Sequence, residues 1–298
     1  MKNKLTLSTA LLLTVPPVLW AGNAIVGRLV RDAVPPMTLN LLRWSIALLI
    51  LLPLGRAALK DGSGALRHWR RYLLLGLFGI GLYNSLQYLA LQTSTPINVT
   101  LVASSMPVSM LLVGRLFFGV PVKRRQISGA LLSIAGVLVV LCRGDVHQLL
   151  GLRLVIGDLY MILATIAWSF YSWMLMQRKD VPAVRADWAA FLLAQVGYGV
   201  LWSAALAGGE WALQDADIAW SWPLAAALLY VAIGPAFLAM RCWGAGVQCA
   251  GPSIGAFFIN LTPLFTALLS SAVLGEAPHL YHVLAFGLIV GGIAVSAR

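Results

Sequence analysis

The chain has 298 residues, of which 60% are hydrophobic and only 10% are charged, and its formal net charge is +11. A soluble domain carries roughly 25% charged residues, so this composition excludes a water-soluble protein. The basic residues cluster in alternate loops between apolar segments, which indicates a membrane protein and argues against a nucleic-acid partner.

Ten apolar segments follow one another along the chain, each close to the roughly 20 residues that a helix needs to cross a bilayer. They lack the strict alternation of barrel strands, so the sequence predicts an all-α integral membrane protein in which residues 1–298 form a single transmembrane domain. In chain order, the ten predicted helices cover residues 7–29, 36–55, 71–93, 96–118, 126–142, 157–177, 188–207, 221–243, 252–274 and 279–297.

The N-terminus has two interpretations, because Lys2 and Lys4 before an apolar run are also found in signal peptides. The run continues past Trp20, so we expect it to be retained as the first membrane helix. Most of the 21 Lys and Arg residues lie on the side of the N-terminus, and the loop around Glu210 on the other side has none. By the positive-inside rule, both termini are expected in the cytoplasm.

The two halves of the chain resemble each other. A shift of 156 residues pairs Pro96 with Pro252, Pro107 with Pro263, Gly119 with Gly275 and Gly136 with Gly292. Earlier in each half, a shift of 148 residues pairs Trp20 with Trp168, Arg31 with Lys179 and Asp32 with Asp180. The sequence therefore predicts two five-helix repeats, about residues 1–150 and 151–298, and the second is inverted because five is odd. Inverted repeats are typical of secondary transporters, whose halves exchange shapes to open a site to each side in turn.

Polar and aromatic residues near the middle of the predicted helices are candidates for a small-molecule site. Spacings of three or four residues place a ring and a polar group, or two rings, on one helical face. Interhelical packing is the alternative role for each of them. The candidate substrate-binding residues are Trp20, Asn23, Arg43, Tyr83, Gln87, Ser105, Trp168, Tyr171, Tyr230 and Asn260.

Arg43 is predicted to lie near the bilayer centre, where a charge costs at least about 2.5–3.5 kcal/mol. We expect a substrate carboxylate, backbone carbonyls near a kink, or water to compensate it. Pro107, Pro235 and Pro263 are candidate hinges, because proline removes a backbone donor from a helix. Proline is also simply more frequent in membrane helices, so a structural role is the alternative.

Several absences narrow the function. No GxxxxGK[ST] motif occurs, so ATP hydrolysis is not expected. The Lys residues all lie at or beyond helix ends, which disfavours an exchanger of phosphorylated or nucleotide-linked metabolites but leaves it open as an alternative. No Asp, Glu or His is predicted at mid-membrane, so we expect uniport-like export by alternating access. The paired groups of an intramembrane enzyme are missing, and a receptor or scaffold is the remaining alternative.

The cysteines show no pattern typical of a metal site or a disulfide framework, since Cys142, Cys242 and Cys249 form no CxxC pair. We therefore expect no metal and no cofactor. The expected partners are a small-molecule substrate and the lipid bilayer, and the expected oligomeric state is a monomer.

Three short motifs carry a family resemblance: Leu19-Trp20-Ala21-Gly22-Asn23, Leu42-Arg43-Trp44, and Leu274-Gly275-Glu276 followed by Gly287 and Gly292. Along essentially its whole length, the chain resembles the EamA branch of the drug/metabolite transporter superfamily. The resemblance implies ten helices in two five-helix units, a bacterial inner membrane and transport of a small molecule. Within the family the chain is most similar to the YddG-type exporters, which implies aromatic and other neutral amino acids as substrates. The repeats differ at Glu276, whose equivalent in the first half is Val120.

Overall fold

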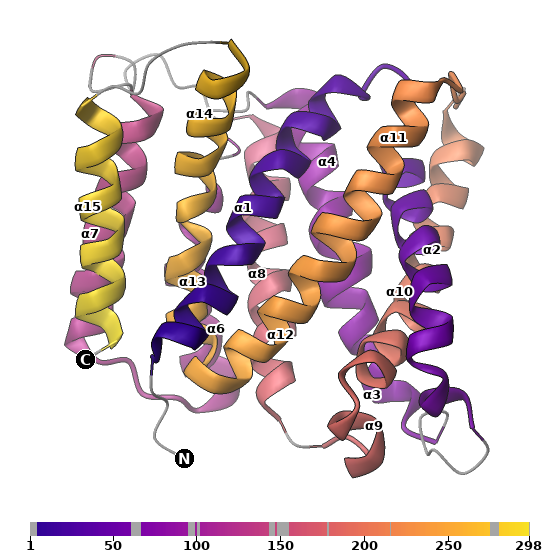
Figure 1. Ribbon diagram of the computed structural model, residues 1–298, viewed down its shortest axis with the longest axis horizontal. Helices are drawn as coiled ribbons and strands as arrows, with labels where there is room; N and C mark the ends of the chain where they lie inside the picture. The colour runs from indigo at the N-terminus through magenta and orange to yellow at the C-terminus, as the bar shows by residue number, and fades with distance from the viewer. Residues whose placement is uncertain are drawn as a thin grey trace.

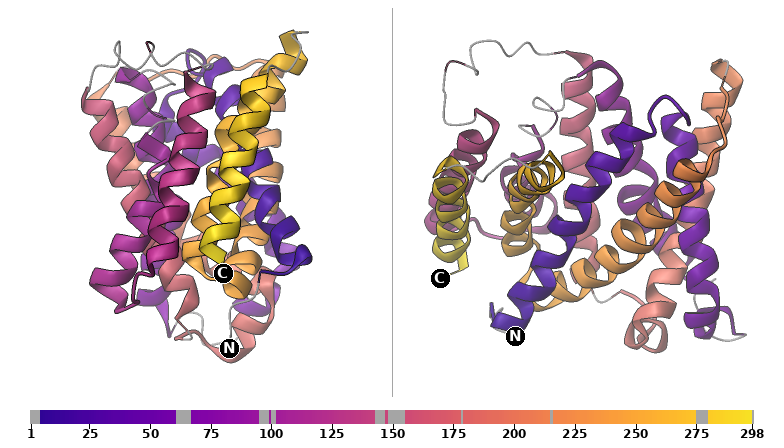
Figure 2. Two further views of the ribbon diagram at one scale, coloured as in Figure 1. Left: turned by 90° about the vertical axis from the view of Figure 1, so that its left-hand side faces the viewer. Right: turned by 45° about the horizontal axis from the view of Figure 1, so that its top comes forward.

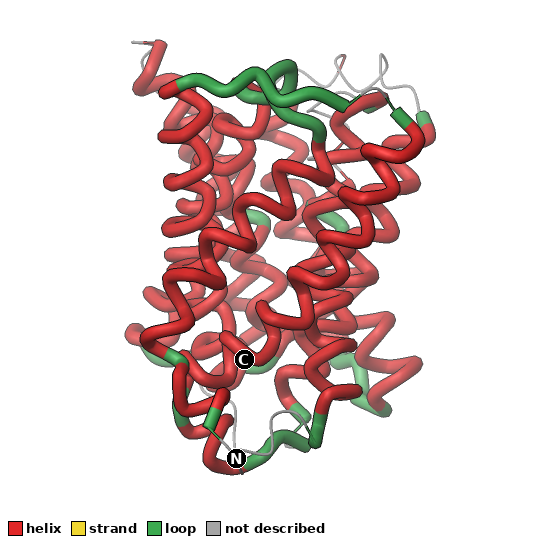
Figure 3. Tube along the Cα trace, turned by 90° about the vertical axis from the view of Figure 1, so that its right-hand side faces the viewer, coloured by secondary structure: helices red, strands yellow, loops and turns green. Residues whose placement is uncertain are grey.

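The computed structural model describes residues 5–60, 67–94, 99, 102–142, 147, 155–177, 179–214, 216–274 and 280–297. These residues form a bundle of helices, and no strand occurs among them (Figures 1 and 3). Nine helical stretches of the described chain are long and apolar enough to cross a membrane. The prediction of an all-α, multi-span membrane protein is thereby confirmed.

The described helices follow the predicted spans closely. The first half contains α1 (Leu7–Leu29), α2 (Pro36–Leu54), α3 (Trp69–Gly76), α4 (Tyr83–Thr93), α6 (Met106–Phe118) and α7 (Arg124–Leu141). The second half contains α8 (Ile156–Met176), α9 (Pro182–Ala186), α10 (Trp188–Leu213), α11 (Trp222–Val231), α12 (Ala239–Ala250), α13 (Pro252–Ile259), α14 (Leu261–Leu274) and α15 (Leu280–Ala297). The predicted repeat boundary near residue 150 lies outside the described residues, as do Gly275 and Glu276.

The two ends of the bundle differ in their connections. The start of α1, the end of α15 and the short helix α9 lie toward one end, which we call the α9 face (Figure 1). The turn between α1 and α2 and the start of α11 lie toward the other end, the opposite face (Figure 2, right). Local caps set several helix starts, because Asp187 accepts hydrogen bonds from the Ala189 and Ala190 amides and Ser221 accepts one from the Leu224 amide.

Two membrane spans are interrupted by π-helical segments at equivalent positions. The segment between α3 and α4 covers Leu77–Leu82, and that between α11 and α12 covers Ala232–Leu238 and contains Pro235. A shift of 156 residues maps the first segment onto residues 233–238, so the irregularity belongs to the repeat. Such π-helical turns are frequent at functional sites because they free backbone carbonyls.

Two further helix breaks also match under this shift. The helical path is interrupted at Ser104 and Ser105 before α6, and at Asn260 between α13 and α14. Pro107 and Pro263 each lie in the first turn after a break, where a backbone N–H has no intrahelical partner to lose. These prolines therefore begin new helical segments and do not kink continuous ones.

Helices α7 and α15 form an antiparallel pair at one side of the molecule (Figure 2, left). Their backbones touch: a Cβ added to Gly129 would lie 2.7 Å from the Gly292 carbonyl oxygen, and one added to Gly136 would lie 2.9 Å from that of Ala285. The shift of 156 residues turns the first of these contacts into the second. The pair thus obeys the two-fold relation expected of an inverted repeat.

Helices α2 and α10 are tied together at the opposite face by Glu210, which the sequence places in a loop. The carboxylate of Glu210 accepts hydrogen bonds from the Met37 amide at 3.0 Å and from the amide and hydroxyl of Thr38 at 2.9 and 2.8 Å. It therefore caps the positive end of α2, and α10 extends to Leu213, beyond its predicted end at residue 207.

Candidate functional site

Five aromatic side chains from both halves meet inside the bundle and form what we call the aromatic cluster: Trp20 on α1, Tyr83 on α4, Trp168 and Tyr171 on α8, and Trp243 on α12. The ring of Trp168 is central, with centroid distances of 5.3 Å to Trp20, 4.9 Å to Tyr83, 5.1 Å to Tyr171 and 5.5 Å to Trp243. Edge-to-face and tilted contacts at these distances are favourable for aromatic rings.

Some of the indole N–H and hydroxyl groups of the aromatic cluster have hydrogen-bond partners, and others have none among the described residues. The Trp20 indole donates to the Pro235 carbonyl in the π-helical segment at 3.3 Å, and the Tyr171 hydroxyl donates to Gln195 at 3.1 Å. The indole N–H groups of Trp168 and Trp243 are buried without an acceptor among the described residues. A buried donor without a partner is unfavourable, so these two groups are available to an acceptor on a ligand.

A polar cluster centred on Arg43 adjoins the rings. The Arg43 side chain is 1% exposed, and its Nη1 donates to Asn84 at 3.1 Å, to the Tyr88 hydroxyl at 3.0 Å and to Asn23 at 3.4 Å. Asn23 lies one turn along α1 from Trp20, and Asn84 directly follows Tyr83, so the two clusters share helices α1 and α4.

The charge of Arg43 is not neutralised by an acid in the described part of the chain. Side-chain oxygens of Asn23, Asn84 and Tyr88 compensate it, and these partners were not among those predicted from the sequence. Its guanidinium also lies 5.3 Å from the Trp44 ring centroid, within the range of a cation–π contact. Arg43 Nε is buried and has no hydrogen-bond partner among the described residues.

The structure does not gather all the predicted residues at this place. Tyr230 is 37% exposed and donates to the Leu19 carbonyl at 3.2 Å, and Asn260 donates to Ser133 on α7 at 2.9 Å. Ser105 donates to the Val102 carbonyl at 2.6 Å within its own helical turn, and Gln87 is half-buried on α4. Of the candidate hinges, Pro235 is the one whose carbonyl contacts the aromatic cluster.

Trp243 was missed by sequence reasoning, although the repeat carries a signal for it. The shift of 156 residues pairs Trp243 with Gln87, which we did select. Trp243 is the last residue of the predicted span, 221–243, and so was not a mid-membrane candidate, whereas the real helical stretch continues to Ala250. A search for aromatic residues at positions equivalent to each candidate would have found it.

Comparison with known proteins gives consistent matches along the chain. Residues 7–142 and 155–298 match the EamA-like transporter family. An uncharacterized transporter of Archaeoglobus fulgidus is 26% identical over 290 residues, which cover 96% of each chain. The aromatic amino acid exporter YddG of Ancylobacter novellus is 25% identical over 266 residues, covering 89% of this chain and 88% of the exporter. A crystal structure with 24% identity superposes with a TM-score of 0.74 over 97% of this chain and 96% of that one, which supports the fold.

Proposed function

Because the chain belongs to the EamA-like transporter family, we propose that it exports neutral amino acids, including aromatic ones, by alternating access across a bacterial inner membrane. The observation that carries the substrate class is the aromatic cluster, to which both halves contribute, beside a buried arginine that has no acidic partner among the described residues. Family membership makes this protein a transporter, and the similarity to an exporter of aromatic amino acids supports the choice of substrate.

The chemistry of the two clusters suits an amino acid with an apolar side chain. Ring faces of the aromatic cluster can stack against an aromatic or aliphatic side chain and attract an ammonium group. The free Nε of Arg43 and the unpaired indole N–H groups of Trp168 and Trp243 are all donors, as a carboxylate requires. Arg43 is the one formal cation among the described residues of the site, so the site suits a carboxylate with a single negative charge better than a divalent phosphate.

The proposed membrane orientation follows from charge. Many basic residues lie in or beside the connections of the α9 face (Figure 1): Arg56, Lys60, Arg67, Arg70, Lys123, Arg124, Arg125, Lys179 and Arg185. By the positive-inside rule, we propose that this face lies in the cytoplasm. The carboxylate of Asp158, which accepts a hydrogen bond from the Val155 amide, is held at the start of α8 near the opposite face and does not lie at mid-membrane. Without a mid-membrane acid in the described chain, we propose uniport-like export driven by the substrate gradient.

Transport in proteoliposomes tests this function. The purified chain should release radiolabelled phenylalanine, neutral amino acids should compete, and hexose phosphates and nucleotide sugars should not. At fixed substrate, an imposed proton gradient should leave the initial rate unchanged. Competition by phosphorylated metabolites would support the exchanger instead, and vesicles that retain every amino acid as tightly as empty ones would support a receptor or scaffold.

Replacing Trp168 or Trp20 with Ala is expected to lower the initial rate of transport at least about tenfold, which corresponds to ~1.4 kcal/mol. Trp168→Ala removes the ring that contacts the other four, and Trp20→Ala also removes the hydrogen bond to Pro235. Rates should be normalised to folded protein, because removing a buried ring also destabilises the fold. Trp222→Ala, at a side chain that is 89% exposed, is the control. Wild-type rates in both cluster variants would remove these rings from the site.

A further inference from the structure

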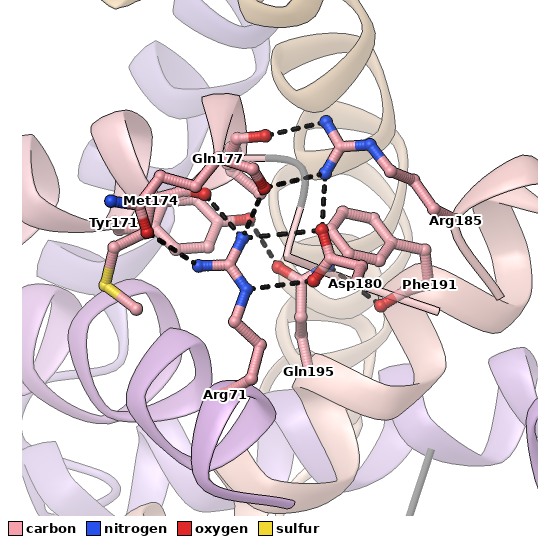
Figure 4. Close-up of polar contacts among 9 residues, drawn as sticks. Arg71, Tyr171, Met174, Gln177, Asp180, Arg185, Phe191 and Gln195 are labelled. Carbon is pink, nitrogen blue, oxygen red and sulfur yellow. Dashed lines mark hydrogen bonds and ion pairs between the residues drawn. The ribbon is translucent and has the colours of Figure 1, made fainter. Parts of the chain in front are cut away.

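A buried ionic network joins the two halves at the α9 face (Figure 4). Arg71 on α3 contacts Asp180 through Nε at 2.9 Å and Nη2 at 3.4 Å, and Arg185 on α9 contacts the same carboxylate. The Asp180 side chain is 0% exposed, and those of Arg71 and Arg185 are 9% and 17% exposed. The Asp180 carboxylate thus forms ion pairs with two guanidinium groups. The buried network therefore carries one positive charge in excess.

The excess charge is stabilised by the end of α8. Arg71 Nη2 donates to the carbonyls of Met174 and Gln177 at 2.6 and 3.0 Å, and Arg185 Nη2 donates to the Leu175 carbonyl at 2.8 Å. These carbonyls belong to the last turn of α8 and its C-cap, Gln177, where the helix dipole is negative. Arg71, a residue of the first half, is therefore fastened to the last turn of a helix of the second half.

Among the described residues, the opposite face has no equivalent of this network. The shift of 148 residues pairs Asp180 with Asp32 and Arg185 with Met37, and the shift of 156 residues pairs Arg71 with Ala227. The Asp32 side chain is 88% exposed and pairs with its neighbour Arg31 at 3.3 Å. Since Met37 and Ala227 carry no charge, these paired positions cannot form the same ionic contacts.

We propose that Arg71, Asp180 and Arg185 form a one-sided lock that positions the two halves and favours the state in which they are closed together at the α9 face. The proposal rests on the alternating-access function proposed above. In that cycle the inverted halves exchange shapes, and identical contacts at both faces would make the two states similar in energy. Opening the α9 face separates α3 from the end of α8 and breaks the contacts of Arg71, which the paired positions at the opposite face, Asp32, Met37 and Ala227, do not reproduce.

Spin-label distances across the α9 face test the lock in the full chain. Arg70 on α3 and Ala183 on α9 are both exposed and outside the network, so each is replaced with a labelled cysteine after the three native cysteines are changed to Ala. Arg71→Met severs the link between the halves and leaves the neutral Asp180–Arg185 pair, so no buried charge is left without a partner in this variant. We expect the fraction of long distances to rise at least about threefold, and Asp180→Glu to stay close to wild type.

The matched control is Asp32→Asn, which removes the equivalent carboxylate at the opposite face and should leave the distances unchanged. With the closed state less favoured, substrate supplied from the α9 face should also show a lower apparent KM in Arg71→Met, because more molecules are open to that side. Unchanged distances in both Arg71→Met and Asp180→Asn would overturn the lock, as would an equal change in Asp32→Asn. A failure of the proposed function is distinguished by the transport assay, since the wild-type chain would then not transport amino acids at all.

Discussion

Replacing Arg43 with Met is expected to lower kcat/KM for phenylalanine by about a hundredfold, or ~2.7 kcal/mol, while the protein stays folded. The substitution removes a buried charge that has no acidic partner in the described chain, so no carboxylate is left unpaired. The hydrogen bonds to Asn23, Asn84 and Tyr88 are lost, but Tyr88 still donates to Asn23 at 3.5 Å. The expected loss therefore comes mainly from the missing partner of the substrate carboxylate.

Phenethylamine, which is phenylalanine without its carboxylate, separates this role from a structural one. The wild-type protein should prefer phenylalanine over the amine, and Arg43→Met should lose that preference. Arg43→Lys should recover little, because an ammonium group lacks the planar set of donors that can hold three oxygens and a carboxylate together. Arg241→Met is the control, since Arg241 stacks over Trp188 at 4.1 Å, away from both clusters. An equal loss for both compounds would show that Arg43 acts by holding α1, α2 and α4 in place.

The membrane fold was largely predictable from the sequence because a bilayer imposes a length on each apolar segment. The predicted span 279–297 agrees with α15 within one residue, and 36–55 agrees equally well with α2. Span ends were less accurate where polar residues are buried by partners from other helices. Glu210 extends α10 because it caps α2, a contact between residues more than 170 positions apart that no local pattern reports.

The candidate site was predicted in part. Helical spacing identifies one face of α8 with Trp168 and Tyr171 and one face of α1 with Trp20, and the structure brings these rings together. The neutral partners of Arg43 come from two other helices, and the π-helical segments depend on packing, so neither could be derived from residue spacing. The sequence reveals Arg71 and Arg185 only as two of the many basic residues on the side of the N-terminus, because the carboxylate that they share is visible only in three dimensions.

The close packing between the halves should be especially sensitive to substitution of Gly76, where α3 touches α10. A Cβ at this position would lie 2.6 Å from the Gly199 backbone nitrogen and 2.9 Å from the Gln195 carbonyl oxygen. Both neighbours are backbone atoms of a packed helix, so rotation of a side chain cannot relieve the clash. Gly76→Ala is therefore expected to destabilise the protein by about 1–3 kcal/mol, despite the higher helix propensity of Ala. Thermal unfolding of the detergent-solubilised protein measures the effect.

Gly197→Ala is the matched control, because Gly197 lies on α10, the helix that Gly76 touches, and an added Cβ there would meet no atom within 4 Å. With no clash, the substitution should be neutral or should stabilise the protein by up to about 1 kcal/mol through helix propensity alone. Gly76→Ala should also reduce transport, because α3 carries Arg71 and leads directly into the π-helical segment at Leu77. Equal melting temperatures for the two variants would mean that α3 and α10 can move apart at little cost. The close contact between Gly76 and α10 would then not contribute to the stability of the protein.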